Sequence, residues 1–181
     1  MKQFLTHFKW KLGYCLLCFV ILISLSSCGF RPRGQTPLPP SLYHLYLQTP
    51  DPYGPLAHNI QQYLKSSGVH LADSPQHADS VLVILTENKY EQLLSVGGTQ
   101  QTRQYNLILT VTFQITTPDG RALIPPQASS ETRTIPIQAN QVLGGSNEAN
   151  NLYRQMRQAI VYDIMNRLAS QNIATQLMKK P

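Results

Sequence analysis

Residues 103–116, RQYNLILTVTFQIT, alternate apolar and polar side chains with a period of two. Successive side chains of a β-strand point to opposite faces of its sheet, so this alternation predicts a strand with one core face and one mostly polar face. The apolar set that defines the core face is Tyr105, Leu107, Leu109, Val111, Phe113 and Ile115. We therefore expect a sheet in which this strand has one packed face.

The segments on either side of this strand predict two further strands. Residues 80–96 open with the apolar run VLVIL and then become polar through Glu87, Lys89 and Glu91, which is typical of a strand that starts buried on both faces and ends half exposed. Residues 97–102 would form the hairpin tip. After a turn at Pro118-Asp119-Gly120, residues 121–138 return as a weaker strand. Pro125 and Pro126 would break it, and with Pro136 they predict an edge strand or an irregular one, because proline donates no ladder hydrogen bond.

The segments before the three strands predict a strand, a helix and a loop. Residues 41–48, SLYHLYLQ, are predicted to form the first strand, with His44 as an ordinary strand residue. A helix is expected over residues 55–66, because Pro55 suits a first helical position and the apolar residues that follow recur with a helical spacing. Gly68 would end this helix. Residues 69–80 are expected to form a short extended piece and a polar loop.

The last element is predicted to be a long helix over residues 147–176, about 45 Å in length, with a frayed tail behind it. Its core face would carry Leu152, Met156, Ile160, Ile164 and Leu168, and its other faces Arg154, Arg157, Asp163 and Arg167. The element order is then β-α-β-β-β-α. A helical crossover implies a parallel, right-handed first pair, whereas short links imply antiparallel hairpins. The predicted fold class is α+β, a two-layer sandwich with two helices packed on a mixed four-stranded sheet. The other face of that sheet would be partly exposed to solvent or covered by a partner.

The beginning of the chain has the pattern of a bacterial lipoprotein signal. Lys2, Lys9 and Lys11 precede an apolar run over residues 12–25. This run is shorter than the roughly 20 residues that a helix needs to span a bilayer. Two serines then precede Cys28, as a peptidase requires when the cysteine is to carry the lipid. The alternative, an uncleaved transmembrane helix, fits less well because a basic segment follows.

The expected organisation has four parts. Residues 1–27 form the cleaved signal peptide, and residues 28–40 form the lipidated N-terminus and a proline-rich tether. Residues 41–176 form a single α+β domain, and residues 177–181 form the tail. Cys28 would bear an S-diacylglycerol and an N-palmitoyl group, and Gly29 behind it favours the outer membrane, with the domain facing the periplasm.

Composition argues against several classes of protein. Three of the 15 Lys and Arg residues lie in the predicted signal peptide, so the rest of the chain carries 12 against 9 Asp and Glu, a charge of +3. A mildly basic exported protein is a poor candidate for nucleic-acid binding. Cys15 and Cys18 have a C-x-x-C spacing, but both lie in the part to be removed. We expect no metal, and no cofactor apart from the covalent lipid.

No catalytic motif is recognisable, so an enzyme is not expected. His70, His77 and Asp79 lie near one another in sequence but have no further ligand at a suitable spacing. The domain is rich in Gln, Asn, Thr and Tyr and has few charges. That composition suits a protein enclosed by another protein, and it suits equally well a solvated lipoprotein of low charge.

Several short motifs, taken in order, resemble a known family. The first is Cys28-Gly29-Phe30-Arg31-x-Arg33-Gly34, and the second is Asp51-Pro52-x-Gly54-Pro55-Leu56 before a helix that ends in Gly68-Val69. The strand around Tyr105 and the pair Asn147-Glu148 at the start of the last helix complete the set. In order and spacing these motifs are similar to those of the LPS-assembly lipoproteins, the LptE family, over nearly all of the mature chain.

The resemblance implies a fold, a partner and a ligand. Members of the family have two helices on a four-stranded sheet and sit as a plug inside the β-barrel of the outer-membrane protein LptD. They assist assembly of that barrel and bind lipopolysaccharide (LPS) during its transfer to the outer leaflet. No bond is made or broken in this role.

The LPS contact needs cations, because lipid A phosphates are bound by Lys or Arg. The basic residues implicated in the family lie near the hairpin tip and the start of the last helix, where this chain has Gly97-Gly98 and Gly144-Gly145. Arg103 is the nearest cation to the tip, and Lys89 and Arg133 are further LPS-binding candidates. Two other functions stay open at this point: a pilotin or scaffold lipoprotein for another outer-membrane machine, and a periplasmic hydrolase, which the missing nucleophile motif disfavours.

Overall fold

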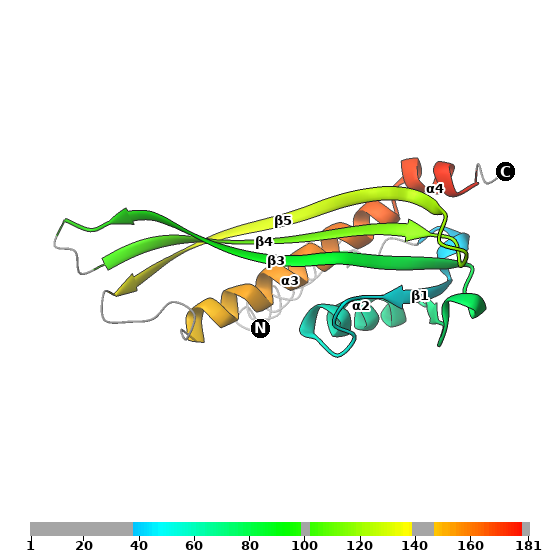
Figure 1. Cartoon of the computed structure of the whole chain (residues 1–181), viewed down its shortest axis with the longest axis horizontal. Coiled ribbons are helices and arrows are strands. Elements are labelled where there is room, and N and C mark those ends of the chain that lie inside the picture. The colour runs from blue at the N-terminus through cyan, green and yellow to red at the C-terminus, as the bar shows by residue number, and fades with distance from the viewer. Residues whose placement is uncertain (1–37, 99–101, 139–146, 179–181) are drawn as a thin grey trace, which may run out of the picture. The chain divides into compact units, whose positions relative to one another are not determined.

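The computed structural model describes residues 38–98, 102–138 and 147–178. The predictions for the signal peptide, for Cys28, for the hairpin tip at 99–101 and for residues 139–146 lie outside these ranges. The described elements, in chain order, are η1 (Pro40–Leu42), β1 (His44–Gln48), α2 (Pro55–Ser66), β2 (His70–Leu71), η2 (Pro75–His77), β3 (Ser80–Val96), β4 (Thr102–Thr116), β5 (Ala122–Gln138), α3 (Asn147–Leu168) and α4 (Gln171–Met178) (Figure 1).

The strands form one mixed sheet in the order β2-β1-β3-β4-β5. β1 runs parallel to β2 and to β3, whereas β3, β4 and β5 are joined as antiparallel neighbours. The α+β class and the parallel-then-antiparallel pairing are confirmed. The predicted number of four strands was one too low, because His70 and Leu71 pair with β1 as a separate strand. Two residues are too few for a side-chain period to show in the sequence.

The sheet has a short part and a long part. β1 pairs with β3 only from Ser80 to Val83, and beyond that point β3 pairs with β4 alone among the described strands. Figure 1 shows β3, β4 and β5 running on together past β1, with α3 alongside them. The short strand and α2 therefore lie beside one end of a longer three-stranded ribbon.

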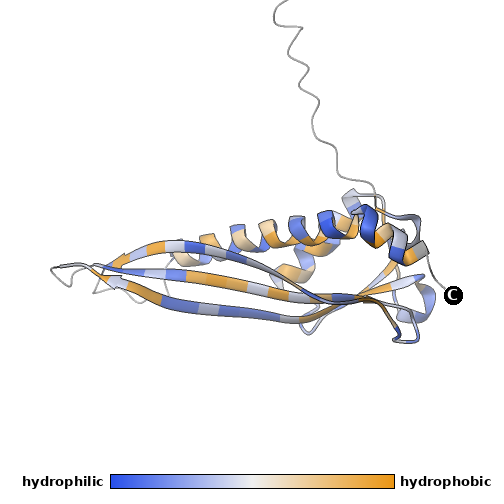
Figure 2. Cartoon of the chain, turned by 90° about the horizontal axis from the view of Figure 1, so that it is seen from above, coloured by the Kyte–Doolittle hydropathy of each residue, from blue (hydrophilic) through white to orange (hydrophobic). Residues whose placement is uncertain are grey.

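The core lies between the sheet and the helices. Alternate residues of β4, from Leu107 to Ile115, have no exposed surface, which confirms the core face predicted from the period of two. α3 and α2 bring the matching apolar residues Met156, Ile160, Ile164, Leu168, Leu56, Ile60 and Leu64. Figure 2 shows α3 lying along one face of the long strands. We call this side of the sheet the helix face and the opposite side the open face.

α2 has the predicted bounds, and glycine ends it. Gly68 has a φ of 78°, and the amide of Val69 donates to the carbonyl of Leu64 at 3.0 Å. This left-handed position is one that glycine adopts without steric cost. The turn after β4 works in the same way, since Gly120 has a φ of 84° and its amide donates to the carbonyl of Thr117.

The long C-terminal helix was predicted as one piece, and this prediction was wrong. α3 ends at Leu168, the amide of Ser170 turns back to the carbonyl of Arg167, and the carbonyl of Ser170 accepts the first hydrogen bond of a new helix, α4. Serine is a favoured residue at a helix N-terminus, so Ser170 is a signal for the start of a new helix. The apolar pattern continues past this serine, and for that reason the signal was missed. The change of direction lets Ile173 and Leu177 become buried. α4 also continues to Met178, past the predicted helix end at residue 176.

The prolines of β5 have the predicted effects. β5 is an edge strand, and although it is one strand from Ala122 to Gln138, its pairing with β4 is irregular at Pro125 and Pro126, where the register shifts between Gln127 and Ile124. Both prolines are exposed, as is Pro136. On an outer edge no neighbouring strand requires the missing amides, so the strand can continue.

The packed region begins before the predicted domain start at residue 41. Leu38 is 4% exposed and belongs to the core cluster, and η1 begins two residues later at Pro40. Among the described residues, no helix is both long and apolar enough to cross a membrane.

Candidate functional site

The three cations predicted to contact LPS all lie on the helix face of the long strands. Lys89 and Arg133 stand opposite the buried residues Leu109 and Leu107 of β4, on either side of that strand. Arg103 stands opposite the buried Ile137, close to the hairpin tip. The structure thus brings all three to one face, with Lys89 and Arg133 on neighbouring rungs and Arg103 further out.

The three candidates differ in how far other residues already engage them. Arg133 forms an ion pair with Glu131 at 2.8 Å and donates to the carbonyl of Thr132. The ammonium of Lys89 lies 5.3 Å from the centre of the Tyr153 ring, within range of a cation–π contact. Arg103 is exposed, and none of the ion pairs found among the described residues includes it. It is therefore the candidate whose charge is most available to an anion.

An ion pair between a buried arginine and a half-buried glutamate joins β3 to α3. The Nε of Arg157 donates to Oε1 of Glu87 at 2.7 Å, and Arg157 is only 8% exposed. The helical period of the apolar residues predicts Arg157 away from the core face of its helix, and this prediction was wrong. The reason is that β3 carries Glu87 on its helix face, opposite Val111, so a cation on α3 can be buried there with its charge compensated.

A second contact between β3 and α3 lies one turn along the helix. The hydroxyl of Tyr153 donates to Oε1 of Glu91 at 3.3 Å. Burial, the charge of Glu91 and this hydrogen bond raise the pKa of Tyr153 to about 12, against a smaller lowering by Arg157. Tyr153 is thus a neutral donor at physiological pH. The alternate residues Glu87, Lys89 and Glu91 all engage α3, and we call this set with Tyr153 and Arg157 the β3–α3 seam.

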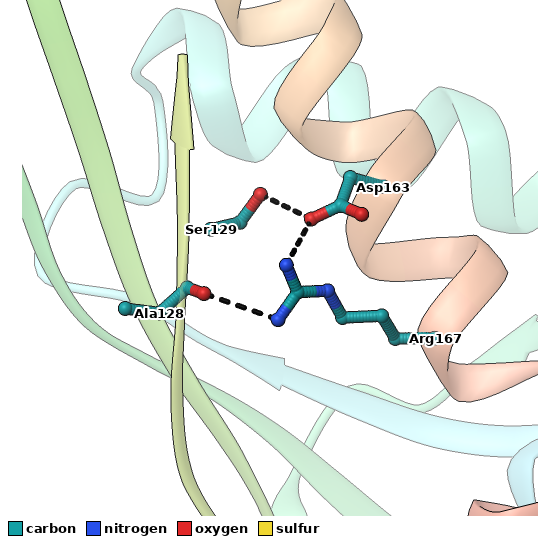
Figure 3. Close-up of polar contacts among 4 residues, drawn as sticks. All are labelled: Ala128, Ser129, Asp163 and Arg167. Carbon is teal, nitrogen blue, oxygen red and sulfur yellow. Dashed lines mark hydrogen bonds and ion pairs between the residues drawn. The ribbon is translucent and has the colours of Figure 1, made fainter.

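A matching set of polar contacts ties α3 to β5 on the other side. The buried Ser129 donates to Oδ2 of Asp163 at 2.5 Å, and Arg167 reaches the same oxygen at 2.8 Å. Arg167 also donates to the carbonyl of Ala128 at 3.1 Å. Figure 3 shows the Asp163 carboxylate between the hydroxyl and the guanidinium. Asp163 and Arg167 had been predicted on the outer faces of the helix, whereas they border the sheet.

A cavity of about 520 Å³ opens where β1 ends and the chain turns towards α2. Its lining comes from the turn, from the start of α2, from β3 and from α3: Thr49, Pro50, Asp51, Gly54, Pro55, Leu56, Ile84, Glu87, Lys89 and Arg157. Two carboxylates and two cations face it. The charges are therefore balanced, and no single sign of ligand charge is favoured.

The histidines do not converge on one point. His70 stacks on His44 at 5.3 Å between ring centres, whereas Nδ1 of His77 shares a hydrogen bond with the hydroxyl of Ser74. In the ranges that the structure describes, no three His, Cys, Asp or Glu side chains are grouped as a metal site.

Comparison with known proteins identifies the family. The family model LptE, described as lipopolysaccharide-assembly, matches residues 42–168. The chain belongs to the LptE family. This confirms the resemblance that the short motifs indicated.

Relatives and solved structures agree with the family assignment. The LPS-assembly lipoprotein LptE of Yersinia enterocolitica is 32% identical over 154 residues, which cover 84% of this chain and 73% of the relative. The rare lipoprotein B of Shewanella oneidensis has a TM-score of 0.60 at 25% identity, over 71% of this chain and 96% of that one. An uncharacterised lipoprotein B of Nitrosomonas europaea shares the fold, with a TM-score of 0.62 at 20% identity, over 78% of this chain and 90% of that one. The α+β fold described above is thus the fold of these solved lipoproteins.

Proposed function

We propose that this LptE-family protein is an outer-membrane lipoprotein that forms a complex with an LptD-type β-barrel, plugs it and assists its assembly. It takes part in transfer of LPS to the outer leaflet, is anchored by lipid on Cys28 and faces the periplasm. Its work is binding and assembly, without catalysis. The observation that carries the proposal is the family match over residues 42–168, which span most of the described domain.

The distribution of charge on the long strands supports enclosure by a partner. All six charged residues of β3, β4 and β5 stand opposite buried residues of the helix face: Glu87, Lys89, Glu91, Arg103, Glu131 and Arg133. The open face carries none. It is built from Thr86, Asn88, Tyr90, Gln92, Ser95, Gln104, Asn106, Ile108, Thr110, Thr112, Ala128, Ser130, Thr132, Thr134 and Pro136.

Polar groups on this open face already pair with one another. Thr110 and Ser130 share a hydrogen bond of 2.9 Å, and the hydroxyl of Thr134 donates to the amide oxygen of Asn106 at 2.8 Å. Covering such a surface desolvates no charge, and these paired groups keep their partners, so it costs less than covering a surface of Lys and Glu side chains. This property suits a protein that is surrounded by another protein.

LPS would be held through its phosphates by cations at the outer end of the helix face. Arg103 is the first candidate because it is exposed and close to the tip, and Lys89 and Arg133 follow. A guanidinium can make two parallel hydrogen bonds to a phosphate, which makes Arg103 chemically suited to this contact.

The test is a detergent pull-down of the acylated protein from outer membranes, with the captured barrel identified by mass spectrometry and LPS assayed in the eluate. We expect an LptD-type barrel in about a one-to-one ratio, together with LPS, because the complex is a plug in one barrel. A Cys28→Ala variant, which cannot be lipidated, is the control for membrane delivery. Recovery of a different barrel or a secretin would instead favour the pilotin or scaffold function and contradict the proposal.

A further inference from the structure

The outer edge of β3 lacks a neighbour over most of its length within the described residues. β1 pairs with β3 only as far as Val83, so the backbone from Ile84 to Val96 pairs on the β4 side alone. A strand edge in this state presents amide and carbonyl groups that another extended chain can pair with. The sheet therefore has a position beside β3, in line with β1, that no described strand fills.

The exposed apolar side chains of the described residues gather on this same stretch. Of seven large hydrophobic residues that are exposed, five belong to β3: Leu85, Tyr90, Leu93, Leu94 and Val96. Tyr90 is 62% exposed and Leu93 is 50% exposed. A free backbone edge and exposed apolar side chains on one strand together indicate a surface that another chain covers.

The central part of this β3 edge is regular, between two irregularities in its pairing with β4. The pairing of β3 with β4 shifts between Ile84 and Thr86 and again between Leu93 and Ser95, which leaves residues 86–93 in an unbroken register. β3 contains no proline, whereas the other edge of the sheet, β5, has three. The β5 edge is thus partly blocked for a further strand, and the β3 edge is able to accept one.

The charged residues of this stretch are already engaged with the helix. Glu87 pairs with Arg157, Glu91 accepts from Tyr153, and Lys89 lies over the Tyr153 ring. Charges on an edge strand normally discourage pairing, but here each is directed at α3. The remaining side chains beside the edge, such as Asn88, Tyr90 and Gln92, are uncharged, so a matching strand would be uncharged as well.

We propose that residues 86–93 of β3 accept an additional strand, an extended uncharged segment of the barrel partner. The inference rests on the proposed function, which supplies that partner. The strand would continue the line of β1, and its end would enter the cavity lined by Ile84, Glu87 and Lys89 of β3 and by Thr49 and Pro50 behind β1. Backbone pairing would give affinity, and the apolar side chains around Leu93 would select the partner.

The first test is residue-resolved hydrogen–deuterium exchange of the isolated lipoprotein and of its complex with the barrel. Alternate amides of residues 86–93, those not bonded to β4, are expected to exchange roughly a hundredfold more slowly in the complex, because a new hydrogen bond must open first. The outward amides of residues 127–134 on the β5 edge are the control and should change much less. Equal slowing on both edges, or none on β3, would overturn the inference.

The second test uses two lysine substitutions on one rung of the sheet. Tyr90 and Thr132 both stand opposite Ile108, on the same face but on opposite edges, and both are exposed. Both variants place one charge on the open face, but only Tyr90 borders the proposed strand, so Tyr90→Lys should lower recovery of the barrel about tenfold more than Thr132→Lys does. Equal effects of the two variants would point to a face contact and overturn strand pairing.

A photo-crosslinker at Tyr90 identifies the occupant. Crosslinks to the barrel support the inference, whereas crosslinks to a second copy or to the chain's own residues 1–37 overturn it. Failure of the proposed function is a separate result, because the unsubstituted protein would then recover no LptD-type barrel at all. If that barrel is recovered and the β3 edge shows neither protection from hydrogen exchange nor crosslinks, only the strand-pairing inference is contradicted.

Discussion

At the scale of single residues, the buried charges are what sequence patterns predicted least well. Arg157 looked like an outer-face residue because helical periodicity assigns faces from apolar positions alone. Its burial depends on Glu87, which comes from another element 70 positions earlier. One signal was present: Glu87, Lys89 and Glu91 alternate on a single strand face, and charges on a face that is covered by a helix need partners. The identity of those partners requires the fold.

The Glu87–Arg157 pair yields the first prediction. Glu87→Gln should lower the free energy of unfolding by about 2 kcal/mol, because Arg157 stays buried without its counter-charge; the cost is moderated because the Glu87 side chain is 25% exposed. Urea denaturation followed by circular dichroism measures this. Glu131→Gln, which breaks the pair with the exposed Arg133, is the matched control and should cost less than about 1 kcal/mol, because Arg133 stays hydrated without its partner. Equal losses for the two variants would show that burial does not distinguish the pairs.

Tyr153 yields a prediction about alkaline pH. Its pKa is raised to about 12 in the folded chain, against about 10 in an unfolded one. The folded state therefore favours the protonated phenol, and this contribution to stability is complete below pH 10 and is lost as the pH rises towards 12. Urea midpoints measured from pH 8 to 11.5 should fall more steeply for the wild type than for Tyr153→Phe. Parallel curves would contradict the pKa shift, and the ultraviolet titration of the phenolate gives an independent check.

At the scale of elements, strong local sequence patterns predicted the bounds of a helix or strand, and weak patterns did not. β3, β4 and α2 were predicted with their bounds nearly unchanged, because each has a period or a terminating residue of its own. β2 has only two residues and acquires its identity from pairing with β1. The break between α3 and α4 was missed because Ile173 and Leu177 continue an apolar pattern, although they pack in a new direction after Ser170.

The docking of α4 can be tested at the same scale. Ile173→Ala should lower the free energy of unfolding by about 2 kcal/mol, near the low end for a buried isoleucine, because a terminal helix can detach without unfolding the sheet. The neighbouring Asn172→Ala, at an exposed position, is the control and should have little effect. Hydrogen exchange should also speed up in residues 171–178 but not in α3. Faster exchange throughout α3 would show that the two helices behave as one element.

At the scale of the whole described domain, the sheet separates two kinds of surface. The helix face carries every charge of the three long strands and buries the core, while the open face carries none and the β3 edge has no described neighbour beyond Val83. Composition alone indicated only that charges were few. Their separation onto one face follows from strand register, since a period of two sends alternate residues to opposite sides.

This separation makes the outer end of the helix face the place to test LPS contact. Arg103→Ala should lower the LPS recovered with the acylated complex about tenfold, because a charge-assisted hydrogen bond to phosphate contributes on the order of 1.5–3 kcal/mol. The amount of barrel recovered should not change, since Arg103 stands apart from the proposed strand-pairing segment. Arg121→Ala, an exposed arginine in the turn at the other end of β4, is the control and should retain LPS. If both variants retain LPS, Arg103 is not a phosphate ligand and Lys89→Ala becomes the deciding variant; if both lose it, the loss reflects net charge and not a localised contact.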